Sequence, residues 1–206
     1  MLDTYGRKYA DRFIEPGASI FEKIKWKPTH VTIAALMIGL IAAAGYLLGL
    51  PTALPVLLLW FSGYLDTVDG ALARRTGHVT ALGTLLDIFF DRVVELTFIV
   101  VFAIRHPESV SEQLFLTCAI VLSMTVFLTG GNLLKNTGIK TFRYQTGLME
   151  RTDGFIMFTI MMIFNDYMKF LTAIYAALIL FTAMQRLVLT IMELSRTEKE
   201  GQKNED

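Results

Sequence analysis

Apolar residues form six long blocks along the chain, separated by short stretches of glycine, proline and charged residues. Blocks such as Val31–Leu50 and Phe170–Val188 approach the ~20 residues that an α-helix needs to cross a lipid bilayer. The pattern predicts an all-α integral membrane protein with six transmembrane helices. These helices are expected over residues 30–49, 53–74, 80–104, 111–134, 152–167 and 169–195.

The segment before the first block has a different pattern. Apolar residues at helical spacing, from Leu2 to Ile24, alternate with five lysines and arginines. This is typical of an amphipathic helix that lies in the membrane interface, and Pro16-Gly17 is a candidate break in it. The alternative interpretation is an ordinary charged tail.

The chain therefore divides into a membrane domain over residues 1–197 and a short terminal tail. We assign residues 1–27 to the amphipathic interfacial helix and residues 28–197 to a six-helix bundle. Residues 198–206 are rich in charge, and we expect them to form a disordered cytoplasmic tail.

Basic residues predict the orientation. Fifteen lysines and arginines fall in the N-terminal segment, the Arg74-Arg75 turn, the 135–151 connector and the tail, against two on the opposite side. Since basic residues stay on the cytoplasmic side, both termini are expected there. We expect the protein in the plasma membrane of a prokaryote.

Composition excludes some classes of function. The formal net charge is zero, so no basic field indicates a nucleic-acid partner. The single cysteine, Cys118, excludes an intrachain disulfide and a metal site built on several cysteines.

Several charged residues fall inside the second and third apolar blocks. Asp66 and Asp69 are three residues apart, and Asp87 and Asp91 are four apart, so each pair shares one helix face. An ionised side chain at the bilayer centre costs roughly 2.5–3.5 kcal/mol, so these aspartates are expected to face the bundle interior. The short turn near Gly77 makes the two helices antiparallel and brings both pairs to a similar depth.

Carboxylates crowded together repel each other unless cations neutralise them. Oxygen ligands favour Mg²⁺ or Mn²⁺ over zinc, so we expect a divalent metal site, with two ions shared by the four aspartates. Such a pair of ions would resemble the two-metal sites that act on phosphoryl groups. The alternatives are salt bridges of the aspartates with nearby arginines, an ion- or proton-coupled transporter that uses the buried acids, and a non-catalytic scaffold.

Residues 66–91 read D-T-V-D-G-A-L-A-R-R-T-G-H-V-T-A-L-G-T-L-L-D-I-F-F-D. This segment resembles the signature of the CDP-alcohol phosphotransferase family (also called CDP-alcohol phosphatidyltransferases), class I: D-x2-D-G-x2-A-R-x8-G-x3-D-x3-D. All eight fixed positions match. The six-span layout, the interfacial helix and the stretch Lys27-Pro28-Thr29-His30-Val31-Thr32 extend the similarity over most of the chain.

The resemblance implies phospholipid biosynthesis by transfer of a phosphatidyl-type group from a CDP-linked lipid to an alcohol, with release of CMP. It implies that Asp66, Asp69, Asp87 and Asp91 lie at the metals and that Asp91 is the general base. It also implies that CDP and its phosphates lie against a set of seven residues: Thr32, Asp66, Asp69, Gly70, Ala73, Arg74 and Gly83. The donor is CDP-diacylglycerol or an archaeal equivalent.

Later arginines bear on the acceptor alcohol. Arg143, Arg151 and Arg186 would suit an anionic acceptor such as glycerol phosphate or inositol phosphate, and Arg151 and Arg186 resemble arginines of family members that use phosphorylated polyols. An unphosphorylated acceptor such as serine is the alternative. For Arg186, one turn from the cytoplasmic face, snorkelling is the competing explanation. We also expect a homodimer.

Overall fold

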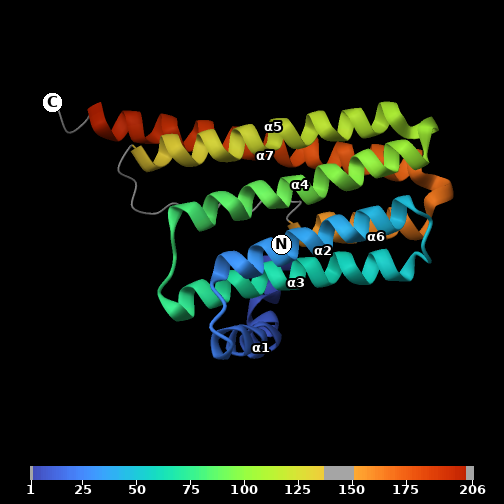
Figure 1. Cartoon of the computed structure of the whole chain (residues 1–206). Coiled ribbons are helices and arrows are strands. Elements are labelled where there is room, and N and C mark those ends of the chain that lie inside the picture. Colours follow the sequence, from blue (N-terminus) through green and yellow to red (C-terminus); the bar gives the residue numbers. More distant parts are fainter. Residues whose placement is uncertain (1, 137–150, 203–206) are drawn as a thin grey trace.

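The structure, a computed structural model, describes residues 2–136 and 151–202, and these residues form helices without a strand (Figure 1). The α-helices are α1 (Leu2–Lys23), α2 (Pro28–Leu47), α3 (Ala53–Thr76), α4 (Ala81–Arg105), α5 (Val110–Asn136), α6 (Arg151–Ile163) and α7 (Met168–Gln202). Short 3₁₀ turns at Pro107–Ser109 and Asn165–Tyr167 precede α5 and α7. Helices α2–α7 thus begin and end within four residues of the six predicted segments, except that α7 continues seven residues past residue 195.

Helix α2 lies between α3 and α4 and packs against both, whereas α3 and α4 make little direct contact (Figure 1). Helices α5 and α7 form a second, closely packed pair, and α6 contacts α3 and α7. The α3–α4 turn and the ends of α5 and α7 lie at one end of the bundle (Figure 1). This end carries the basic residues Arg74 and Arg75 of the α3–α4 turn.

Small side chains let α2 fit between its neighbours. A Cβ added at Gly39 would lie 2.8 Å from Val94 Cγ2 on α4 and 3.0 Å from Ser62 Oγ on α3. Ser62 Oγ donates to the Ala35 carbonyl of α2 at 2.7 Å, which fixes α3 against this small-residue face. Glycine at position 39 is therefore required for the three helices to approach this closely.

An aromatic core joins the two groups of helices. The Phe158 ring of α6 lies 5.6 Å from both Phe98 and Phe102 of α4 and 5.9 Å from Tyr175 of α7, measured between ring centroids. Tyr46 of α2 contacts Phe102 edge to face at 5.5 Å. These offset and edge-to-face geometries are the ones that aromatic rings prefer.

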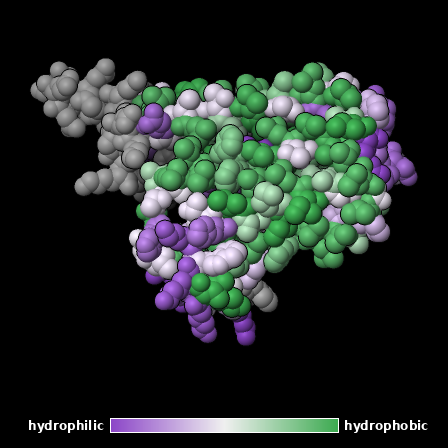
Figure 2. All heavy atoms as spheres, in the orientation of Figure 1, coloured by the Kyte–Doolittle hydropathy of each residue, from purple (hydrophilic) through white to green (hydrophobic). Residues whose placement is uncertain are grey.

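The outer surface is largely apolar, as Figure 2 shows, with polar side chains gathered toward the ends of the bundle. Within the described residues, four stretches of helix are long and apolar enough to cross a membrane: Pro28–Leu47, Ala53–Thr76, Pro107–Leu134 and Asn165–Arg196. Between 28% and 44% of each apolar window is buried, so most of its side chains face outward, as lipid-facing residues do. Helix α6 is shorter, with 13 residues, and α4 contains several charged residues.

Two expectations about the ends of the chain need correction. Helix α1 continues through Pro16, because Gly17 and the fully buried Ala18 pack against α3, where a Cβ at Gly17 would collide with the Tyr64 hydroxyl. Helix α7 continues to Gln202, so residues 198–202 are helical and not disordered. Extending an existing helix costs far less than starting one, and this allows a charged segment to remain helical.

Candidate metal and catalytic site

The predicted aspartates come from two helices joined by a four-residue turn. Helix α3 ends where Gly77 adopts φ = +69°, a left-handed conformation that favours glycine. Helix α4 then begins behind Thr80, whose hydroxyl accepts a hydrogen bond from the Gly83 amide at 3.0 Å. This turn places the last turns of α3 and the first turns of α4 at the same end of the bundle.

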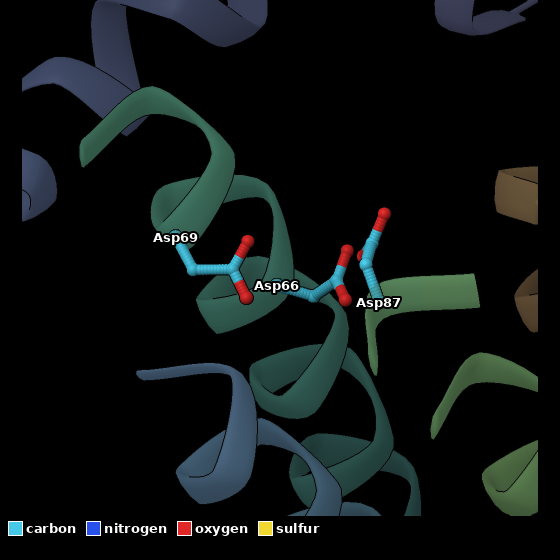
Figure 3. Close-up of side chains that lie close together, drawn as sticks. All are labelled: Asp66, Asp69 and Asp87. Atoms are coloured by element: carbon cyan, nitrogen blue, oxygen red, sulfur yellow. The ribbon is translucent and has the colours of Figure 1, made fainter. Parts of the chain in front are cut away.

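Three of the aspartates converge. One carboxylate oxygen from each of Asp66, Asp69 and Asp87 lies within 4.8 Å of the others. In Figure 3 the Asp66 and Asp69 side chains extend from α3, Asp87 comes from α4, and the carboxylates gather in one space. Asp66 and Asp69 are only 9% and 6% exposed, and Asp87 is half-buried. The predicted convergence of the two helices is therefore observed for these three acids.

The donor set fits a hard divalent cation. The Oδ2 atom of Asp69 is buried and has no hydrogen-bond partner among the described residues. A buried carboxylate oxygen without a partner is costly, and a bound cation would remove that cost. Ligand oxygens about 2.0–2.6 Å from an ion lie within about 5 Å of one another, which agrees with the observed spacing.

Asp91 lies one helical turn beyond Asp87 on α4, away from the α3–α4 turn, and is half-buried. Its carboxylate is within electrostatic range of Asp87, Asp69, Arg92 and Glu95. It therefore borders the three-acid cluster without being one of its three members.

The residues expected around the nucleotide lie near the α3–α4 turn. Arg74 is exposed and folds back over Gly70, where an added Cβ would lie 3.4 Å from its Nη1 atom. Ala73 and Gly83 are half-buried. On α2, the buried Thr32 donates its hydroxyl hydrogen to the Pro28 carbonyl at 3.0 Å and lies beside the Asp69 carboxylate.

The predicted acceptor arginines are only partly described. Arg186 belongs to α7, and its side chain contacts α5. Its Nη1 donates to Ser123 Oγ at 3.3 Å, and its guanidinium lies 5.3 Å from the centre of the Phe127 ring. Helix α6 begins at Arg151, whose side chain lies outside the described part of the structure, as does all of Arg143.

Two ion-pair arrangements were missed by sequence reasoning. Arg75 pairs with Glu15 at 2.5 Å and with Glu22 at 2.9 Å, which ties α1 to the end of α3. Arg92 pairs with Glu95 one turn along α4. Spacing could have indicated the Arg92 pair, whereas the Arg75 contacts join residues far apart in sequence. Of the arginines in the salt-bridge alternative, Arg75 and Arg92 thus pair with glutamates.

Comparison with known families and proteins finds matches over most of the chain. The model of the family described as CDP-alcohol phosphatidyltransferase matches residues 25–193. The chain is 30% identical over 197 residues to an archaetidylinositol phosphate synthase of Aeropyrum pernix, covering 91% of this chain and 95% of that protein. It is 27% identical over 168 residues to a phosphatidylinositol phosphate synthase of Corynebacterium glutamicum, covering 76% and 72% of the two chains.

A solved structure shares the fold. The phosphatidylinositol phosphate synthase of Mycobacterium tuberculosis, determined with CDP-DAG bound, superposes with a TM-score of 0.68. The two chains are 22% identical, and the match covers 87% of this chain and 94% of the other. At this level of identity the likeness supports the arrangement of the helices.

Proposed function

The chain belongs to the CDP-alcohol phosphatidyltransferase family, and from this we propose that it transfers a phosphatidyl-type group from a CDP-linked lipid to inositol phosphate, releasing CMP. The observation that carries the proposal is the convergence of Asp66, Asp69 and Asp87, three acids of the family signature, within 4.8 Å. Two similar proteins are named as synthases of inositol phosphate lipids, which favours inositol phosphate over glycerol phosphate and over serine.

We assign Asp66, Asp69 and Asp87 as metal ligands, with Asp91 completing a site for two Mg²⁺ or Mn²⁺ ions. Bound divalent ions supply positive charge that neutralises the pyrophosphate and stabilises the departing CMP. The unpartnered, buried Oδ2 of Asp69 supports its place among the ligands. On α3, Asp66 and Asp69 face the same space because they are separated by nearly one helical turn.

The reaction joins the acceptor to the phosphorus that carries the lipid. The acceptor hydroxyl oxygen attacks this phosphorus, the bond to the bridging oxygen of the pyrophosphate breaks, and that oxygen leaves with CMP. Asp91 accepts the hydroxyl proton as general base. Its position, one turn from Asp87 and at the edge of the cluster, supports this role because a base must lie beside the reacting centre.

We place CDP against Thr32, Gly70, Ala73, Arg74 and Gly83, together with Asp66 and Asp69. Small residues there leave backbone accessible to a nucleotide, and the exposed Arg74 guanidinium over Gly70 is positioned to meet a phosphate. Thr32 extends the set to α2, which lies between the two helices that carry the acids.

Arg186, with Arg143 and Arg151, would bind the phosphate of the acceptor. An arginine within an apolar helix is costly and usually functional, and Arg186 is held against Ser123 and Phe127, which limits its freedom.

In the membrane, we propose six spans, α2–α7, with α1 in the interface. The end of the bundle that carries the α3–α4 turn faces the cytoplasm of a prokaryotic cell. The basic residues at this end support that orientation. We further propose a homodimer, in which a second copy covers exposed apolar residues of α4 such as Leu85, Phe89 and Val100.

The test uses purified protein in detergent with CDP-diacylglycerol, Mn²⁺ or Mg²⁺, and inositol phosphate, glycerol phosphate or serine as acceptor. We expect release of CMP that requires both metal and inositol phosphate, and that falls at least about 100-fold in Asp91→Asn, as loss of a general base predicts. Asp166→Asn, the same change at an exposed position of the opposite turn, is the matched control. Release independent of acceptor, or unchanged in Asp91→Asn, would contradict the proposal.

A further inference from the structure

The Tyr175 hydroxyl lies where three helices meet. Tyr175 belongs to α7, is 1% exposed and packs its ring against Phe158 of α6. Its hydroxyl donates a hydrogen bond to Glu95 Oε1 of α4 at 3.5 Å. A polar group this deeply buried needs a partner, and here the partner comes from the helix that carries Asp87 and Asp91.

Glu95 is held from two sides. Its Oε2 forms the ion pair with Arg92 of the same helix, and its Oε1 accepts from Tyr175. Glu95 follows Asp91 by four residues, so the two carboxylates lie on one face of α4, one turn apart. The position of Tyr175 is therefore linked to that of Asp91 through a single helical turn.

Helix α6 has a glycine, Gly154, where the Tyr175 hydroxyl contacts it. A Cβ added at Gly154 would lie 2.8 Å from the Tyr175 hydroxyl oxygen, closer than real Cβ atoms come to such an atom. Because α6 begins only three residues earlier, at Arg151, this contact also sets the start of α6 against α7. The absence of a side chain at Gly154 thus leaves the space that the Tyr175 hydroxyl occupies.

The link matters because the backbones of α4 and α7 otherwise approach each other at few positions. Tyr175 and Arg186 are eleven residues apart on α7, about three helical turns, so they lie on the same face of that helix. A hydrogen bond at Tyr175 therefore fixes the rotation and axial position of α7, and with it the placement of Arg186 relative to Asp91.

We propose that Tyr175, Glu95 and Gly154 are positioning residues that align the acceptor-binding helix α7 with the metal-bearing helix α4. This inference rests on the proposed function, since it assigns Arg186 to the acceptor and Asp91 to the reacting centre. It predicts that a disturbed junction harms use of the acceptor more than binding of the CDP-linked lipid, whose proposed contacts lie on α2, α3 and the start of α4.

The first test is Tyr175→Phe, which removes only the hydroxyl. We expect the KM for inositol phosphate to rise about fivefold to tenfold, the scale of one lost hydrogen bond, with the KM for CDP-diacylglycerol within about twofold. Tyr46→Phe is the matched control, because Tyr46 is also 1% exposed in the same core and its hydroxyl pairs with His106 Nε2 at 3.3 Å, at the other end of the bundle. It should leave both constants unchanged.

The second test is a rescue. Gly154→Ala should lower kcat/KM for inositol phosphate, because its methyl group needs the space that the hydroxyl occupies. Combining Gly154→Ala with Tyr175→Phe makes room for that methyl group, and the double variant should recover part of the loss seen in Gly154→Ala.

The outcomes separate the two proposals. If the unaltered enzyme releases no CMP with inositol phosphate, the proposed acceptor is wrong and the inference falls with it. If the unaltered enzyme is active but Tyr175→Phe behaves like Tyr46→Phe, the inference alone is wrong. An equal rise in both KM values, or a double variant no better than Gly154→Ala, would indicate a general packing defect and would also overturn it.

Discussion

Removing one acid of the three-acid cluster should raise stability without metal and abolish the response to metal. Carboxylate oxygens of Asp66, Asp69 and Asp87 lie within 4.8 Å of one another. At that distance two unit charges repel by about 3.5 kcal/mol when the effective dielectric constant is about 20. Three pairs give about 10 kcal/mol, and Asp87→Asn removes two of them. Water and counter-ions relieve most of this repulsion, so we expect a net gain of about 2 kcal/mol without metal.

The assay is a thermal melt of purified protein in detergent, with EDTA or with Mn²⁺. For a chain of this length, about 2 kcal/mol corresponds to a rise in Tm of about 4–8 °C for Asp87→Asn in EDTA. Mn²⁺ at about 100 times its Kd should stabilise the unaltered protein by about 2.7 kcal/mol and the variant much less. Asp87→Asn should therefore melt above the unaltered protein in EDTA and below it in Mn²⁺.

Asp166→Asn is again the control, since it removes one exposed carboxylate far along the chain from the cluster. It should melt like the unaltered protein under both conditions. A lower Tm of Asp87→Asn in EDTA would refute the repulsion argument. An equal gain from Mn²⁺ in Asp87→Asn and in the unaltered protein would show that Asp87 is not a metal ligand.

Three further predictions test other parts of the structure. Arg186→Ala should raise the KM for inositol phosphate about 30-fold, because a charge-assisted hydrogen bond is lost, with little change in the KM for CDP-diacylglycerol; equal losses would place Arg186 elsewhere. Gly39→Ala puts a methyl group 2.8 Å from Val94 and should destabilise the protein by about 1–3 kcal/mol and weaken Mn²⁺ binding. Thermal melts with and without metal measure both effects, and an unchanged Tm would show that α2 can shift freely. Arg74→Ala should raise the KM for CDP-diacylglycerol about tenfold. Arg75→Ala loses only the exposed contacts to Glu15 and Glu22 and should have nearly normal kinetics, so similar losses in the two variants would contradict this division of roles.

The sequence predicted the helices well because hydrophobic periodicity is a local property. Each apolar block that was long enough became a helix, and turn residues such as Gly77 and Pro28 mark the boundaries. The errors lie at the ends of the chain. At Pro16 a local helix-breaking signal was overridden by the packing of Ala18 against α3. In the last segment, the high content of charged residues predicted disorder, whereas residues 198–202 continue helix α7.

The candidate site was predictable in part for the same reason. Spacing alone placed Asp66 beside Asp69 and Asp87 beside Asp91, and the short turn at Gly77 returned the second pair toward the first. That α2 would lie between α3 and α4 could not be predicted, because it depends on the volume left by Gly39 against Ser62 and Val94.

The amino-acid sequence by itself determined the helices, the apolar surface and the pairing of acids on each helix, since these follow from periods of 3.6 residues and from short turns. Tertiary structure alone decided which faces meet. It brought Asp66, Asp69 and Asp87 together, paired Arg75 with Glu15 and Glu22, and placed the Tyr175 hydroxyl between α4 and α6. Such contacts join residues up to 80 positions apart, and they are set by how side-chain volumes fill the space between helices, which no local pattern encodes.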